Sequence, residues 1–408
     1  MHADAVVIGG GPAGLAAAAV IAEHTRTDVV VVDEADRAGG RVRGQLYRHR
    51  ESWIVGAKTA ERLIEDAVTA GVTIMSGRHV WSCEPGWHVH ISGGETITAP
   101  RVVLATGAVE RPLPMPGWTL PGVLAVGAVQ QLVQVHRILP GRRVAVVGSD
   151  PLAITAAEEI VLGGGEVVGI FLPSGGPGQS AESRPAHVLQ ALGGFASAAP
   201  AAWQRLGGKL LRRKIVARAA AGMIPASFGI PIGRVRLKAR WRAEAILGTD
   251  HVRALRVQQV DAAGAPQGDH TDIEVDAVCL SGGLTPLQEL AVAHCELVDV
   301  AHVGGAVPLH SPELRTPAPG LYVAGNITGI EGADVAEHQG RLAGTTVAAD
   351  MDAYADGDAR VAAAARRLEQ ARRNAPLSFL PDIADGRKRL ETLWQKHLDK
   401  DQINDDQQ

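Results

Sequence analysis

The residues of this sequence best suited to chemistry are glycines whose spacing is typical of a nucleotide-phosphate site. Gly9, Gly11 and Gly14 form the pattern G-x-G-x-x-G after an apolar run. In such a turn the first glycine allows a tight bend, the second lets the backbone approach a pyrophosphate, and the third lets the following helix pack closely. That helix begins at Pro12 and Ala13, and its free N–H groups would bind phosphate. The pattern alone is weak evidence, so its surroundings carry the prediction.

Two acidic residues end the next apolar run. Asp33 stands about 20 residues after the glycine pattern, where a carboxylate in such folds hydrogen-bonds an adenosine ribose. Glu34 follows it directly. The strand, the glycine turn, the helix and this acidic end together predict a dinucleotide-binding unit.

A second segment near the other end of the chain completes the same site. It contains Gly325 and Asn326 in the sequence LYVAGNITG, which reads as a strand followed by a turn. A helix is expected from about Asp334, with Asp334 and Glu337 at capping-box spacing, and His338 would border the cofactor. A chain whose two ends build one nucleotide site is typical of flavoproteins, so we expect bound FAD and redox chemistry.

A glycine pair and a basic run follow the first acidic end. Gly40, the second glycine of the pair, would let the chain pass the pyrophosphate, and Arg41 is the best candidate in the run for contact with the flavin or its phosphates. A solvated loop or a contact between protein chains is an equally good interpretation of this run. No catalytic residue can be assigned.

The elements that must position these residues are predicted from apolar patterns. Short β-branched runs predict buried parallel strands at 5–8 and 29–32, joined by a helix over 12–24. Residues 142–172 repeat this strand–helix–strand pattern. Residues 72–104 read as a small antiparallel meander that returns to a central strand. The proline-rich segment 111–122 can be neither helix nor central strand and predicts a crossing between domains.

These elements predict an α/β flavoprotein with two dinucleotide-binding domains, in which an NAD-like Rossmann domain is inserted into an FAD-binding Rossmann-like domain. The expected parts are 1–115 (FAD-binding domain, first part), 116–275 (NAD(P)-like domain with an insertion at 173–234), 276–345 (FAD-binding domain, second part) and 346–408 (a helical extension that ends in a disordered tail).

Composition excludes several function classes. The 408 residues carry a net charge of −4 and only 3% aromatic residues, so no nucleic-acid partner is expected. The cysteines Cys83, Cys279 and Cys295 form no C-x-x-C pair, which argues against a dithiol centre or a metal site and favours buried thiols in a reducing compartment. No apolar run reaches the length of about 18 residues that spans a membrane. We expect a cytoplasmic protein, with peripheral attachment to the inner membrane left open.

At this point the sequence resembles a known family. The segments VVIGGGPAGLAAA, VVVVDEADRAGG, LATGAVERPLPMPGWTLPGV and LYVAGNITGIEGA occur in that order. They resemble the FAD-binding subunit of heteromeric amino-acid and amine dehydrogenases. This group includes the B-type subunit of hydrogen cyanide synthase, the A-type subunit of opine oxidase and the alpha subunit of D-hydroxyproline dehydrogenase. The resemblance covers about residues 4–345, and its third segment is specific to this group.

The resemblance implies an FAD site and partners. Carried over by motif, the FAD site comprises Gly9, Gly11, Gly14, Asp33, Gly40, Thr106, Gly107, Gly325 and Asn326. Asn326 stands where the wider superfamily usually has aspartate, but its amide oxygen can still accept a hydrogen bond from the ribityl chain. The implied partner is an oxidase-like flavoprotein, of the glycine or D-amino-acid oxidase type, that takes hydride from the substrate. Electrons would then pass through further flavin or iron–sulfur centres to a respiratory acceptor.

Two departures from the wider pattern shape the hypotheses. Asp150 occupies the position of the second glycine in the second motif, where a carboxylate would obstruct and repel a pyrophosphate, so we expect impaired NAD(P) binding. Residues 346–408 contain no cysteine, whereas the family often carries an iron–sulfur domain there. A small separate iron–sulfur subunit, or a different electron path, is therefore expected. A second flavin or an adenine nucleotide at a subunit interface or in the second domain is left open.

Three functions are compatible with the sequence. The leading hypothesis is an electron-transferring FAD subunit of an opine-, proline- or glycine-type dehydrogenase complex. The alternatives are a free-standing NAD(P)H:acceptor reductase and a flavin-bearing scaffold that does not turn over.

Overall fold

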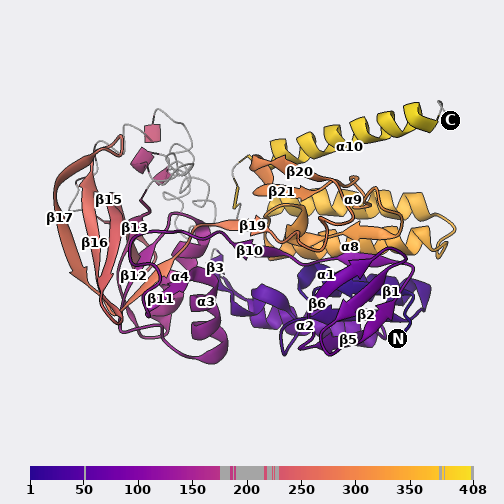
Figure 1. The fold of residues 1–408 in the computed structure, drawn as a ribbon, viewed down its shortest axis with the longest axis horizontal. Helices are drawn as coiled ribbons and strands as arrows, with labels where there is room; N and C mark the ends of the chain where they lie inside the picture. Colours follow the sequence, from indigo (N-terminus) through magenta and orange to yellow (C-terminus); the bar gives the residue numbers. More distant parts are fainter. Residues whose placement is uncertain are drawn as a thin grey trace.

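The two ends of the chain form one lobe and the middle of the chain forms the other. The first lobe is coloured indigo and orange to yellow in Figure 1, and the second is magenta to salmon. The computed structural model describes residues 1–49, 52–174, 184–186, 188–189, 216–217, 223, 225, 229–375, 379–380 and 382–405.

A parallel sheet forms the centre of the first lobe. Its described strands run in the order β22-β9-β1-β2-β5. The β-branched residues of the two central strands are buried because both faces of the sheet are covered. The strand β22 comes from near the C-terminus and pairs with β9, so the two ends of the chain share this sheet. The strand bounds are β1 (Ala5–Ile8), β2 (Val29–Asp33), β5 (Thr73–Ser76), β9 (Val102–Leu104) and β22 (Leu321–Val323).

Helix α1 packs directly on helix α8, which comes from the other end of the chain. A Cβ atom at Gly340 would lie 2.0 Å from the carbonyl oxygen of Ala13, and one at Gly344 would lie 2.6 Å from that of Ala17. Only glycine allows backbones to approach this closely. The helices of this lobe are α1 (Pro12–Thr25), α2 (Gly56–Thr69), α8 (Ala333–Asp350), α9 (Gly357–Asn374) and α10 (Ile383–Asp405).

The C-terminal segment is more ordered than the sequence predicts. Helix α10 continues to Asp405, so the expectation of a disordered tail is wrong as far as that residue. Its apolar side chains Leu390, Leu393 and Trp394 pack against the β20–β21 ribbon, which gives the charged helix a hydrophobic anchor. Across the described helices, none is long and apolar enough to cross a membrane. The ribbon comprises β20 (Leu297–Val300) and β21 (Gly305–Pro308), with the turn η4 (Ala301–Val303) between them.

The expected meander over 72–104 is only partly correct. Its first piece, β5, joins the main parallel sheet beside β2, where Ile74 packs against the core on one face of the sheet and Met75 against the core on the other. The next three pieces do form an antiparallel sheet, in the order β6-β7-β8. The remaining elements of this region are η1 (Gly40–Gly44), β3 (Leu46–His49), β4 (Ser52–Val55), β6 (Val80–Glu84), β7 (His88–Ile91) and β8 (Thr96–Thr98).

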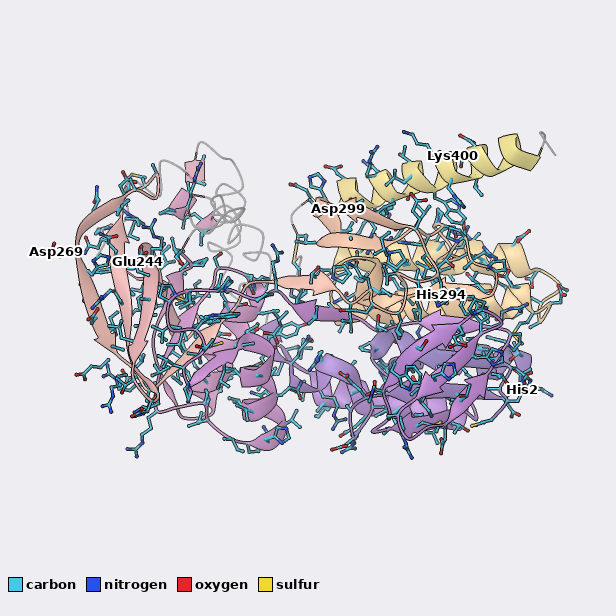
Figure 2. The ribbon with its side chains drawn as sticks, in the orientation of Figure 1. His2, Glu244, Asp269, His294, Asp299 and Lys400 are labelled. Atoms are coloured by element: carbon cyan, nitrogen blue, oxygen red, sulfur yellow. The ribbon has the colours of Figure 1, made fainter. Side chains whose placement is uncertain are left out.

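The second lobe contains a mixed sheet with the order β11-β18-β12-β13-β15-β16-β17. The predicted strand–helix–strand unit is confirmed as β12, α4 and β13, whose strands pair in parallel. The outer strands are antiparallel, and Figure 2 labels Glu244 and Asp269 on them. The bounds are β11 (Val123–Ala125), α3 (Val126–Gln130), the π-helix η2 (Gln131–His136), β12 (Arg143–Val147), α4 (Pro151–Leu162), β13 (Glu166–Leu172), β14 (Ile230–Ile232), β15 (Val235–Gly248), β16 (Val252–Val260), β17 (Pro266–Glu274) and β18 (Ala277–Leu280).

One expected boundary moves. The sequence predicts a return to the first domain at residue 276, but β18 pairs with β11 and β12 inside the second sheet. The return therefore follows β18, through an antiparallel ribbon of β10 (Ala108–Glu110) and β19 (Leu284–Pro286) that lies between the lobes (Figure 1). As predicted, 111–122 contains neither helix nor strand. Most of the insertion at 173–234 lies outside the described residues.

Candidate functional site

The first glycine turn is tightly built but leaves the start of α1 open. A Cβ atom at Gly14 would lie 1.8 Å from the carbonyl oxygen of Gly9, so this position accepts only glycine. At Gly11, by contrast, a Cβ atom would meet no described atom within 4 Å. Gly11 is the N-cap of α1, and no side chain in the described part of the chain caps this end. A helix start that has no side-chain cap and has open space beside its N-cap residue fits an anionic group.

The second glycine pair lies against the first turn. Gly39 donates its N–H to the carbonyl oxygen of Gly10 at 2.7 Å. A Cβ atom at Gly40 would lie 2.9 Å from the Cα atom of Gly11. Arg41 follows and pairs with Glu34 at 3.8 Å, with both side chains about three-quarters exposed. The structure thus brings the predicted residues Gly11, Gly40, Glu34 and Arg41 into one region.

Asp33 holds this region together from within. Its two carboxylate oxygens accept hydrogen bonds from the N–H groups of Gly10 at 2.5 Å and Ala35 at 2.9 Å. Burial raises the pKa of Asp33, although these hydrogen bonds oppose that shift. The side chain therefore stabilises the glycine turn, a role that spacing alone did not indicate. Its contact with a ribose remains a prediction.

Thr106 and Gly107 are hydrogen-bonded to Leu287, in the segment that returns from the second lobe to the first. The hydroxyl of Thr106 donates to the carbonyl oxygen of Leu287 at 2.6 Å, and the N–H of Leu287 donates to the carbonyl oxygen of Gly107 at 3.1 Å. These bonds fix the end of β9 relative to the returning chain. The proton of the Thr106 hydroxyl is therefore used in this structural hydrogen bond.

Gly325 and Asn326 lie in the short turn η5 (Gly325–Thr328), directly after β22. The N–H of Gly325 donates to the side-chain oxygen of the buried Gln339 at 2.8 Å. The side-chain oxygen of Asn326 accepts from the N–H of Glu331 at 3.1 Å. A Cβ atom at Gly325 would lie 2.8 Å from the Cβ of Ala13, so this turn abuts the start of α1. The predicted opening and closing motifs therefore meet in space.

The capping box expected at the start of α8 is not formed. Gly332 is the N-cap, and Asp334 is largely exposed. Glu337 instead accepts hydrogen bonds from Arg62 at 2.6 Å and Arg341 at 2.9 Å. Burial opposes the charge of Glu337, but the two arginines outweigh it and lower the pKa. His338 is bound within its own helix, through Nδ1 and the carbonyl oxygen of Asp334 at 2.9 Å.

The second glycine motif differs from the first at its helix start. The carboxylate of Asp150 caps α4 by accepting from the N–H groups of Leu152 at 2.8 Å and Ala153 at 3.2 Å. The hydroxyl of Ser281 donates to the same carboxylate at 2.6 Å. Burial raises the pKa of Asp150, and these hydrogen bonds oppose the shift. An internal carboxylate thus takes the position at which a helix start would bind phosphate.

Two further carboxylates lie where the lobes meet, and sequence patterns did not indicate them. Glu110 accepts from the N–H of Gly127 at 3.0 Å, at the start of α3. Glu159, fully buried in α4, accepts from the N–H of Leu46 at 3.0 Å. Burial raises the pKa of Glu159 to about 8. The sequence signal was a glutamate on the otherwise apolar face of a helix.

The cysteines are buried and reduced, as the sequence predicts. Burial raises the pKa of Cys83 to about 11 and raises that of Cys295 as well, so neither thiol is activated. The described residues hold no group of three or more histidine, cysteine or acidic side chains arranged to bind a metal ion.

Comparisons with known proteins agree with this architecture. Residues 3–172 match the family described as pyridine nucleotide-disulphide oxidoreductase. The A-type subunit of opine oxidase from Agrobacterium tumefaciens is 31% identical over 364 residues, which cover 85% of this chain and 66% of that protein. Hydrogen cyanide synthase subunit HcnB of Pseudomonas protegens is 31% identical over 181 residues, which cover 42% of this chain and 38% of that protein. The chain thus spans about two thirds of the length of its opine oxidase relative.

The fold is also found among solved structures. The crystal structure of L-proline dehydrogenase from P. horikoshii aligns with a TM-score of 0.63 and 18% identity, covering 91% of this chain and 59% of that one. At this identity the likeness concerns the fold alone. It confirms the expected two-domain flavoprotein architecture of FAD- and NAD-binding Rossmann type.

Proposed function

Because this chain belongs to the FAD-dependent oxidoreductases, in the class of FAD-binding subunits that includes the A-type subunit of opine oxidase, we propose that it works inside a heteromeric amino-acid or amine dehydrogenase. In this proposal a partner flavoprotein oxidises the substrate, and the present chain passes the electrons toward a respiratory acceptor. When bound, FAD supplies the carrier for the two electrons.

The proposed FAD site follows from the residues that meet around the start of α1. The open helix end and Gly11 would hold the pyrophosphate, and Asp33 would reach the ribose. Gly325 and Asn326 would lie along the flavin end of the cofactor. The proposed site comprises Gly9, Gly11, Pro12, Ala13, Gly14, Asp33, Glu34, Gly40, Arg41, Thr106, Gly107, Gly325, Asn326 and His338.

The observation that carries the proposal is the contrast between the two helix starts. Gly11 leaves the N–H groups of α1 available for phosphate, whereas Asp150 occupies those of α4 with its own carboxylate. A nicotinamide dinucleotide at α4 would have to displace two backbone hydrogen bonds and the one from Ser281 while facing a buried acid. The second lobe is therefore poorly suited to deliver hydride from NAD(P)H, which supports a partner protein as the source of the electrons.

The names of the relatives support a partner, since they are subunits. We propose a partner flavoprotein of the glycine or D-amino-acid oxidase type. A small iron–sulfur protein is included in this proposal, because residues 346–408 contain no cysteine that could ligate a cluster. A cytoplasmic location, with peripheral attachment to the inner membrane, is part of the same proposal.

The first test is an anaerobic reduction of the purified chain. The visible spectrum should show bound flavin that stays oxidised after addition of NADH or NADPH. Dithionite is the control, because it should bleach the same flavin and show that it can be reduced. Rapid bleaching by either nucleotide would overturn the proposal and favour a free-standing reductase.

A second test separates electron transfer from a scaffold role. The chain would be co-expressed with its oxidase-like partner, and the substrate-driven reduction of an artificial acceptor would be compared with and without FAD in the present chain. We expect the activity to disappear with the cofactor. A complex that turns over equally well without this FAD would favour the scaffold.

A further inference from the structure

The two C-terminal helices each send one arginine into the loop that carries the proposed flavin-contacting residues. Arg372 of α9 contacts the carboxylate of Glu331 at 3.0 and 3.2 Å, and Arg387 of α10 contacts it at 2.5 Å. Arg387 also donates to the carbonyl oxygen of Thr328 at 2.7 Å. In Figure 2, Asp299 lies on β20, part of the ribbon against which α10 packs, and Lys400 lies in the far half of that helix.

Glu331 relays these contacts to the turn η5. The amide nitrogen of Gln339 donates to Glu331 at 2.8 Å, and this fixes the orientation of the amide. Its oxygen then accepts from the N–H of Gly325 at 2.8 Å and from the hydroxyl of Thr328 at 2.9 Å. Gln339 is fully buried, so each of these partners is needed. The helices α9 and α10 thus determine the conformation of the turn through a continuous chain of hydrogen bonds.

The cluster carries excess positive charge close to this turn. Burial opposes ionisation of Glu331, but the two arginines outweigh it and lower the pKa of the carboxyl. Both arginines stay protonated, so two positive charges face one buried negative charge. Glu369 contacts Arg372 at 2.5 Å and balances part of this charge, but its side chain is more than half exposed, whereas Glu331 and both arginines are largely buried. The buried part of the cluster therefore carries the excess positive charge. The neighbouring His310 adds no charge at neutral pH, because burial lowers its pKa to about 4.

We propose that Arg372 and Arg387 are positioning residues for the flavin: through Glu331 and Gln339 they hold the Gly325–Thr328 turn, and their excess positive charge raises the reduction potential of the cofactor. The inference rests on the proposed FAD site. Reduction adds negative charge to a flavin at neutral pH, and a buried positive charge nearby favours the reduced form. Charge fixed by the C-terminal helices would therefore help the bound flavin to accept electrons from the partner protein.

The test is the midpoint potential of the bound flavin, measured anaerobically against reference dyes in the full-length protein. Arg372→Gln should lower the potential, whereas Glu331→Gln should raise it because it removes the negative charge. Arg373→Gln and Arg389→Gln are matched controls, since they remove exposed charges from the same two helices and should leave the potential unchanged.

Arg372→Lys separates charge from structure. It keeps the charge but loses the planar fork that bonds Glu331 twice, so the unfolding temperature should fall while the potential stays near the parent value. If Arg372→Gln binds flavin fully and keeps the parent potential, the inference is wrong. The outcomes are also distinct from failure of the proposed function: a parent protein that binds no flavin would overturn the FAD site itself, whereas bound flavin with unshifted potentials would overturn only this inference.

Discussion

Replacing Asp150 tests whether a carboxylate of the chain itself closes the second helix start. Asp150→Ala removes the acceptor for the N–H groups of Leu152 and Ala153 and for the buried hydroxyl of Ser281. Loss of a side-chain cap costs about 0.5–2 kcal/mol, and a buried donor left without a partner costs about 1–3 kcal/mol. Because these effects overlap, we expect a loss of about 2–3 kcal/mol in the stability of α4.

The assay is native-state hydrogen exchange of the peptide that covers the start of α4, supported by urea unfolding. A loss of about 2–3 kcal/mol corresponds to exchange roughly 30- to 150-fold faster. Asp150→Asn is the matched control, because asparagine caps helices as well as aspartate does. Ser281→Ala separates the contribution of the hydroxyl from that of the cap.

The raised pKa of Asp150 predicts how the difference in stability between Asp150→Asn and the parent protein changes with pH. Burial raises this pKa, so the stability that the group contributes is present at low pH and is lost as pH rises through the folded-state pKa. At neutral pH, Asp150→Asn should therefore be at least as stable as the parent protein, and its advantage should shrink as pH falls. If Asp150→Ala exchanges at the parent rate, or if Asp150→Asn is as unstable as the alanine variant, the carboxylate does not cap α4 as described.

Two further predictions concern the first site and the contact between the lobes. Gly14→Ala would press a Cβ atom against the carbonyl oxygen of Gly9, so the unfolding temperature of this variant should drop sharply. In Gly11→Ala the added Cβ atom meets open space, so the unfolding temperature of the cofactor-free protein should stay unchanged. The same variant should lose FAD affinity. Thermal unfolding and fluorescence of released FAD measure both effects, and parent-like FAD affinity in Gly11→Ala would contradict the assignment. Burial raises the pKa of Glu159 to about 8 from a usual value of 4.5, so its contribution to stability declines as pH rises through that window. Glu159→Gln should remove this decline in urea midpoints measured on either side of the window, and an unchanged pH profile would count against it.

The closing motif at Gly325 and Asn326 was predicted from the sequence, but two side chains that contact its loop were not. The sequence indicated that Gly325 and Asn326 belong with Gly9 and Gly11, because the two segments match the opening and closing motifs of a split dinucleotide site. It contains no sign that Arg372 and Arg387 reach the same turn. Arginines in charged helices are usually solvated, and only the packing of α9 and α10 against the first lobe leaves these two side chains just 19% and 10% exposed.

The sequence by itself determined the two strand–helix–strand units, the glycine turns and the presence of aspartate at the second helix start, because backbone geometry and strand burial depend on neighbouring residues. Only the tertiary structure decided that β18 stays in the second sheet, that Asp33 holds the first glycine turn, and that Asp150 caps α4 with help from Ser281. Each of these depends on hydrogen bonds between segments far apart in the chain, and no local pattern of residues specifies which distant partner a buried polar group will find.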